Sequence, residues 1–95
     1  MKTDTLFAHL TPRGLEHFFP SARAVKMCGD FPIVQVNLTE VEAGDHWAWW
    51  DAERGRFSMV YRSRGLLDMC SPDGFEHATA IGRGKVMRVR VDIIG

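Results

Sequence analysis

The order of apolar and polar positions divides the chain into a short helical stretch followed by alternating segments. Between residues 11 and 20, Leu15, Phe18 and Phe19 fall at helical spacing, which places them on one face of a helix. Thr11 is a residue type that caps helices, and the proline after it suits the first helical position. We therefore predict one short N-terminal helix over residues 11–20.

From residue 22 onward the apolar positions alternate, which indicates strands. The segments concerned are residues 23–28, 31–38, 46–50, 57–61, 66–70 and 85–94. The strongest signal is a hairpin, because two aromatic-rich runs flank a polar loop at residues 51–56 that contains glycine. Residues 71–74 indicate a turn, or the start of one helical turn that continues to His77.

The last segment is apolar on one face and charged on the other, which is typical of an antiparallel sheet with one face in water. We therefore predict an α+β fold. It consists of an antiparallel sheet of five to six strands with one short N-terminal helix, a single layer covered on one face.

Length and composition limit the class of protein. The chain has 95 residues without an apparent linker or internal repeat, so we predict a single domain over residues 1–95. Hydrophobic residues make up 45% and charged residues 25%, which excludes a disordered chain. No apolar run approaches the ~20 residues of a transmembrane helix. Zero net charge argues against a general nucleic-acid binder.

The N-terminus and the cysteines indicate the compartment. The first ten residues are too polar for a secretory signal, so we expect a cytoplasmic protein of a bacterial host cell. Cys28 and Cys70 have 41 residues between them and form no Cys-x-x-Cys pair. A disulfide between them would not normally persist in a cytosol. We expect free, partly buried thiols.

None of the chemical motifs that we tested predicts catalysis. The four histidines, His9, His17, His46 and His77, show no metal-binding spacing, and Asp45 and His46 should point to opposite faces of a strand. Ser71 lacks a nucleophile-elbow pattern. The Gly82–Lys85 stretch lacks the residues and the helix of a phosphate-binding loop. We predict no catalytic residue, no metal and no cofactor.

Charge is distributed unevenly along the chain. Residues 40–53 contain five acids and no Lys or Arg, whereas residues 54–64 contain four arginines and no acid. A second basic group consists of Arg83, Lys85, Arg88 and Arg90. Two interpretations stay open: the charges pair internally across the strands, or they form separate patches suited to a charged partner.

The three tryptophans add a candidate contact surface. Trp47 and Trp49 share one face of their strand and Trp50 takes the other, so we expect the first two in the core and Trp50 as a surface anchor. Trp and Arg are enriched at binding hot spots. The predicted partner-binding residues are Trp50, Asp51, Glu53, Arg54, Arg56, Arg62 and Arg64. A possible anion or nucleic-acid contact consists of Arg83, Lys85, Arg88 and Arg90.

The last third of the chain carries a resemblance. Residues 68–76 (DMCSPDGFE), 82–86 (GRGKV) and 88–91 (RVRV) look like parts of small proteins encoded by bacteriophages and mobile elements. In size and in its missing catalytic signature the chain is similar to the anti-CRISPR and anti-defence inhibitors. The resemblance implies a protein that blocks a larger host complex stoichiometrically. Many such inhibitors are strongly acidic, whereas this chain is neutral.

These observations lead to one leading hypothesis and several rivals. The leading one is a small non-enzymatic binding protein that blocks or bridges a bacterial protein complex. The first rival is a nucleic-acid-binding domain that uses the basic C-terminal strand. The second is a small hydrolase or RNase-like enzyme with His46 and a nearby carboxylate as acid and base. A structural subunit attached through exposed sheet edges is the third, and a homodimer could form through the same edges.

Overall fold

The computed structural model describes residues 1–70 and 75–95. These residues form six strands and three short helices. In chain order they are β1 (Thr3–Thr11), β2 (Gly14–Phe19), α1 (Ala22–Lys26), β3 (Ile33–Glu40), β4 (His46–Asp51), β5 (Arg56–Tyr61), α2 (Arg64–Met69), α3 (Phe75–Ala80) and β6 (Gly84–Ile93). The turn suggested at residues 71–74 lies outside the described residues, and α3 begins directly after them.

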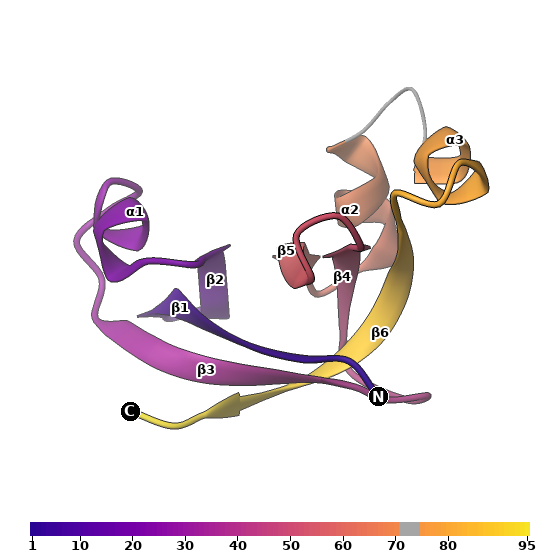
Figure 1. Ribbon diagram of the computed structural model, residues 1–95. Coiled ribbons are helices and arrows are strands. Elements are labelled where there is room, and N and C mark those ends of the chain that lie inside the picture. The colour runs from indigo at the N-terminus through magenta and orange to yellow at the C-terminus, as the bar shows by residue number, and fades with distance from the viewer. Residues whose placement is uncertain (71–74) are drawn as a thin grey trace.

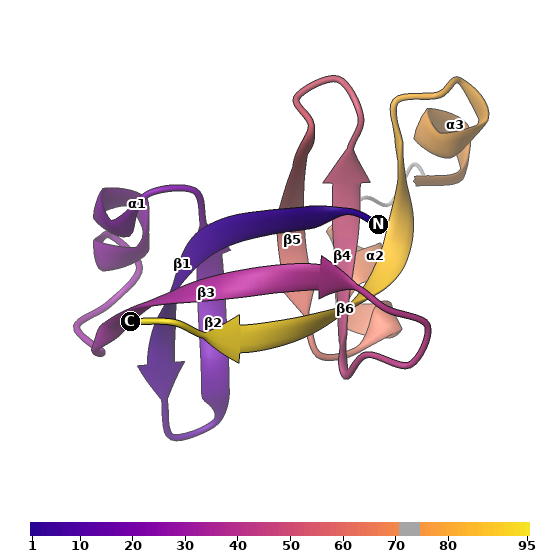
Figure 2. The same cartoon turned by 60° about the horizontal axis from the view of Figure 1, so that its bottom comes forward.

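The strands form one antiparallel sheet in the order β2-β1-β3-β6-β4-β5. The sheet is bent so strongly that its two edge strands, β2 and β5, approach each other and the shape is nearly that of a barrel. In Figures 1 and 2 the β1–β2 and β4–β5 hairpins stand on opposite sides, joined by the long β3 and β6. We call the region where β2 faces β5 the seam.

The curvature places apolar side chains on both faces of the sheet. The inner cluster fills the concave side and consists of Leu6, Ala8, Phe18, Val36, Leu38, Ala48, Phe57, Val60, Met87 and Val89. On the outside, α2 and α3 cover Trp49 with Leu67 and Phe75, while α1 buries Val25 beside β1 and β2. The α+β class is confirmed, but a single layer covered on one face with one helix was wrong.

The predicted N-terminal helix is a hairpin. Thr11 pairs with Gly14 across a two-residue turn, and its hydroxyl accepts the Arg13 amide proton at 3.1 Å and donates to the Gly14 carbonyl at 3.0 Å. A threonine hydroxyl can cap a helix, but in this chain the Thr11 hydroxyl closes a turn. Leu15 and Phe18 imitate helical spacing because β2 bulges at His17, which has a φ of 57°. The extra residue brings positions three apart to the same face.

Two predicted strands are helices. Residues 23–28 and 66–70 coincide with most of α1 and α2. Ser21 accepts the Ala24 amide proton at 3.2 Å, and Ser63 accepts the Leu66 amide proton at 3.1 Å. Each serine satisfies a donor that the first helical turn leaves free. These caps favour a helix in segments whose short apolar alternation looked like a strand.

The remaining strand predictions are confirmed with small shifts at the ends. The segment at 31–38 is β3, the hairpin is β4 and β5, and the last strand is β6. In β6, Met87 and Val89 are buried, whereas Arg88 and Arg90 are exposed. Alternation identifies these strands correctly because each has one face on the core.

The two halves of the chain repeat one pattern, although the sequence analysis found no repeat. Each half runs hairpin, helix, strand, with α3 added before β6 in the second half, and the sheet order is symmetric about the β3–β6 pair. The second strand of each hairpin bulges at a left-handed residue, His17 or Met59. The helices that follow match in detail: Ser21 and Ser63 cap them, and Val25 and Leu67 are fully buried.

The two members of each of these matching pairs are 42 residues apart in the sequence. The same spacing separates Met27 from Met69 and Cys28 from Cys70. In the first strand of each hairpin the spacing is 40, as between the buried Ala8 and Ala48. The two spacings differ because the β4–β5 turn is two residues longer than the β1–β2 turn. The halves are therefore related by an approximate two-fold axis that passes between β3 and β6 and through the seam.

Candidate binding surfaces at the seam and at Trp47

Most of the arginines predicted to meet a partner bind carboxylates of this chain instead. Arg54 lies 3.8 Å from Asp51, Arg56 lies 3.3 Å from Asp4, and Arg64 lies 3.0 Å from Asp68. Of the two interpretations of the charge pattern, internal pairing therefore accounts for a large part. Arg62 is the exception, since its guanidinium has no carboxylate partner among the described residues.

The two acids of the predicted set are also used within the chain. Asp51 accepts the amide protons of Glu53 at 3.0 Å and Arg54 at 3.1 Å, which fixes the turn between β4 and β5. Glu53 lies 3.4 Å from Arg83. Both acids therefore stabilise the hairpin tip, where Arg54 has an 82% exposed side chain.

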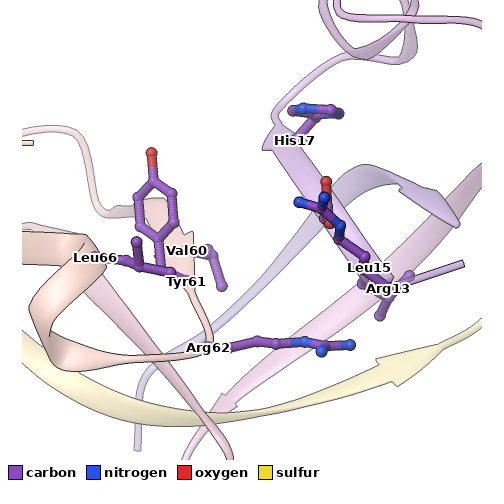
Figure 3. Close-up of a pocket in the computed structure, with 8 residues that line it drawn as sticks. Arg13, Leu15, His17, Val60, Tyr61, Arg62 and Leu66 are labelled. Carbon is purple, nitrogen blue, oxygen red and sulfur yellow. The ribbon is translucent and has the colours of Figure 1, made fainter. Parts of the chain in front are cut away.

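Arg62 lines a pocket at one end of the seam. From the β2 side the pocket is lined by Arg13, Leu15, Glu16 and His17, and from the β5 side by Val60, Tyr61, Arg62 and Leu66. Figure 3 shows Arg62 reaching across from the β5 side toward Leu15 and Arg13. The volume is about 360 Å³, within the range of small-ligand sites. Sequence reasoning found Arg62 but not the pocket, because the pocket depends on the meeting of the two edges.

Gly14 is required at this place. A Cβ atom at Gly14 would overlap the Arg62 guanidinium, and the residue has a φ of 109°, which favours glycine. The Arg62 side chain therefore lies directly against the backbone where β2 begins. This contact extends the guanidinium along the opening of the pocket.

His17, on the pocket wall, is tied to a buried histidine. His9 is fully buried, and its Nδ1 lies 2.9 Å from Nδ1 of His17. His9 Nε2 is also buried and has no hydrogen-bond partner among residues 1–70 and 75–95. A buried donor without an acceptor is costly, so the favoured arrangement has His9 Nδ1–H donating to His17, with His9 Nε2 unprotonated. The pair holds the bulged His17 in place.

Tyr61 lines the pocket and interacts with the Cys70 thiol. A hydrogen bond with the Cys70 thiol, together with burial of the phenol, raises the pKa of Tyr61 above its ordinary value. Cys28 and Cys70 are free and exposed, so the expectation of partly buried thiols was wrong. They follow α1 and α2, which lie in opposite halves of the molecule (Figure 1).

Trp47 forms a second candidate surface beside the pocket. Two guanidinium groups lie over its half-buried ring, with Cζ of Arg64 at 5.4 Å and Cζ of Arg88 at 5.3 Å from the ring centroid. Arg64 Nε binds Asp68 at 3.0 Å, and Arg88 Nε donates to the Gly44 carbonyl at 2.9 Å. We call Trp47, Arg64 and Arg88 the Trp47 surface. Its members come from three elements, β4, α2 and β6.

The other two tryptophans are more enclosed. Trp49 is 7% exposed and stacks on Phe75 at 4.7 Å, as expected for a core residue. Trp50 is half-buried: it packs against the inner cluster, contacts Phe57 edge to face at 4.8 Å, and has the Lys2 ammonium over its ring at 5.2 Å. Trp50 is thus less available as a surface anchor than predicted, because the inner face of the sheet is also covered.

The second basic group is partly neutralised. Arg83 pairs with Glu53 and Arg90 with Asp92 at 2.9 Å, while Arg88 belongs to the Trp47 surface. Lys85 is exposed and makes no ion pair with a described residue. A continuous basic face on β6 is therefore interrupted by carboxylates.

Two of the four histidines, His9 and His46, are buried. His46 is 8% exposed, and its Nδ1 lies 2.9 Å from Asp45, a hydrogen bond that lowers the pKa of the Asp45 carboxyl. The two side chains meet because Asp45 lies just before β4, where strand alternation does not apply.

Within residues 1–70 and 75–95 no three His, Cys, Asp or Glu side chains gather as a metal site. No helix in this part of the chain has the length and apolarity to span a membrane.

The sheet edges, predicted as attachment points, face each other across the seam and each carries a bulge. Bulges of this kind disfavour edge-to-edge pairing with another chain.

Neither a protein-family model, nor a curated protein, nor a solved structure matches the chain. Membership of a family therefore offers no guide, and the geometry of the chain itself has to indicate the function.

Proposed function

We propose that the chain is a small non-enzymatic binding protein that captures an acidic surface of a protein partner through the Trp47 surface. The observation that carries this proposal is the pair of guanidinium groups, from Arg64 and Arg88, that lie over the Trp47 ring. Tryptophan and arginine dominate binding hot spots, and arginine is the side chain best suited to bidentate contact with a carboxylate.

The geometry prepares both arginines for such a contact. Each guanidinium uses its Nε within the chain, through Asp68 or the Gly44 carbonyl, and its Nη groups make no hydrogen bond with a described residue. Stacking on the ring restricts both side chains before binding, which reduces the entropy lost in a complex. Acidic side chains of the partner would then meet two preorganised cations.

The partner that we propose is a bacterial protein complex. The resemblance to anti-CRISPR and anti-defence inhibitors implies host defence machinery in the cytoplasm. In that case the chain would act stoichiometrically, by covering a surface that the complex needs. The nucleic-acid alternative is less well supported, because two of the four cations on and before β6 pair with carboxylates.

The test is capture from nuclease-treated bacterial lysate by the tagged full chain, quantified by mass spectrometry. Arg64→Gln combined with Arg88→Gln should lower recovery of the partner at least about tenfold, as for two charged hot-spot contacts. Arg54→Gln is the matched control, because Arg54 is an exposed arginine at the hairpin tip. It should leave capture unchanged.

Three outcomes would contradict the proposal. If the control variant loses capture and the double variant keeps it, the contact lies at the hairpin tip. If both variants keep it, the Trp47 surface is not the contact. If only nucleic acid is retained, and is released at high salt, the basic strand is the binding element instead.

A further inference from the structure

The two ends of the seam are equivalent by the internal repeat, but only one of them is closed. At the closed end Asp4, whose side chain is 15% exposed, binds Arg56 through Nε and Nη2, each at 3.3 Å. The same carboxylate accepts the amide proton of Phe57 at 3.1 Å. One carboxylate from β1 thus holds the beginning of β5 across the seam.

The other end has the guanidinium without the carboxylate. Gly14 is the counterpart of Arg56, because Gly14 begins β2 as Arg56 begins β5. The Arg62 guanidinium occupies the place that a side chain of residue 14 would take. The counterpart of Asp4, at the spacing of 40 that relates Ala8 to Ala48, is Gly44. It has no side chain, and a Cβ atom there would overlap the Val89 carbonyl. Position 44 therefore provides no carboxylate that could bind Arg62 as Asp4 binds Arg56.

We propose that the open end binds the carboxylate of a small molecule that also carries an apolar or aromatic group. The carboxylate would take the place at Arg62 that Asp4 takes at Arg56, with Arg13 as the second cation. Leu15, Val60 and Leu66 line the same pocket and would contact the apolar part. The site is separate from the Trp47 surface and does not depend on a protein partner.

Size and charge agree with this class of ligand. A pocket of about 360 Å³ lies at the lower end of the range for small-molecule sites, which matches a single ring with one acidic group. Glu16 also lines the pocket, and the Asp45 carboxylate lies close enough to Arg62 for this arginine to contribute to lowering the Asp45 pKa. The positive charge of the two arginines is therefore partly offset, which favours a monoanion over a multiply charged phosphate.

The experiment is a calorimetric titration of the full chain with benzoate, benzamide and inorganic phosphate. Benzoate should bind saturably with one site per chain. Benzamide has the same shape without the charge and should bind at least about tenfold more weakly, because a hydrogen bond to an ionised group contributes more than one to a neutral group. Phosphate lacks the apolar part and should also bind more weakly.

Variants locate the site. Arg62→Gln should reduce benzoate affinity at least about tenfold and Arg13→Gln by a smaller factor, while Arg54→Gln, at the hairpin tip, should leave it unchanged. Arg62 and Arg13 are exposed, so an unchanged melting temperature is expected and shows that the fold is intact.

Four results would overturn the proposal: no saturable benzoate binding, equal binding of benzamide, stronger binding of phosphate, or unchanged affinity in Arg62→Gln. The Arg64→Gln, Arg88→Gln double variant separates this proposal from the proposed function. It should lose protein capture and keep benzoate binding, so that either proposal can fail while the other stands.

Discussion

The two halves of the chain share one architecture and differ in the residues that can bind something else. In the first half α1 packs beside β1, and the ring of the buried His9 lies 5.9 Å from that of Phe31. In the second half α2 and α3 cover Trp49, which stacks on Phe75. The shared positions, namely the serine caps, the left-handed bulges and the buried residue of each helix, explain the fold.

The positions that differ explain the candidate sites. Trp47 stands where the first half has Phe7, and Arg62 stands where it has Pro20. At the seam, Asp4 corresponds to Gly44. The comparison therefore assigns the shared architecture to what the halves have in common, and the candidate binding sites, together with the Asp4 closure of one seam end, to what only one half has.

The largest expected effect tests a shared position. Leu67→Ala removes a fully buried side chain under α2 and should lower the free energy of unfolding by about 2–5 kcal/mol. Val25→Ala, its counterpart under α1, should cost less, roughly 1–2 kcal/mol, because fewer buried carbons are lost. Urea unfolding of both variants measures the difference. A neutral Leu67→Ala would contradict the packing of α2 on the sheet.

A smaller effect is expected at the closed end of the seam. Asp4→Asn weakens the ion pair with Arg56 and the charge-assisted bond to the Phe57 amide, and should lower the free energy of unfolding by about 2 kcal/mol. Asp92→Asn is the control, because Asp92 pairs with Arg90 in solvent, at 51% side-chain exposure. It should cost less than about 1 kcal/mol. Equal effects would mean that the seam is not held by Asp4.

The smallest expected effect makes the halves more alike. His46→Leu places a leucine where the first half has the buried Leu6. It also removes His46 Nε2, which is buried and has no hydrogen-bond partner in the described part of the chain. The free energy of unfolding should rise by about 1 kcal/mol, since an unsatisfied polar atom is exchanged for an apolar contact. A loss of stability in thermal unfolding would show that the Asp45–His46 bond outweighs this cost.

The sequence predicts the β4–β5 hairpin and β6 correctly, because alternation and turn residues act locally. It fails at β2 because the bulge at His17 gives a strand the spacing of a helix. It fails at α1 and α2 because the capping role of Ser21 and Ser63 carries little weight beside the apolar alternation. The repeat has a recognisable signal, a serine followed four residues later by Val or Leu and seven later by Cys, which composition and periodicity do not reveal.

The candidate site was predictable only in part. The arginine-rich stretch and the tryptophans indicated a contact surface, and Arg62 and Arg64 are part of the surfaces described above. Which arginines are left free depends on carboxylates distant in sequence, as Asp4 is from Arg56. The pocket depends on the curvature that brings β2 to β5, and periodicity does not determine curvature.

The most direct test of the contrast between the two ends of the seam is nuclear magnetic resonance of arginine Nε–H groups during a benzoate titration. Arg62 Nε–H should shift saturably, whereas Arg56 Nε–H should stay unchanged, because Asp4 already accepts its proton. That result would show one end closed by the chain itself and the other open to a carboxylate. Equal shifts of both signals, or no shift of Arg62, would contradict the account.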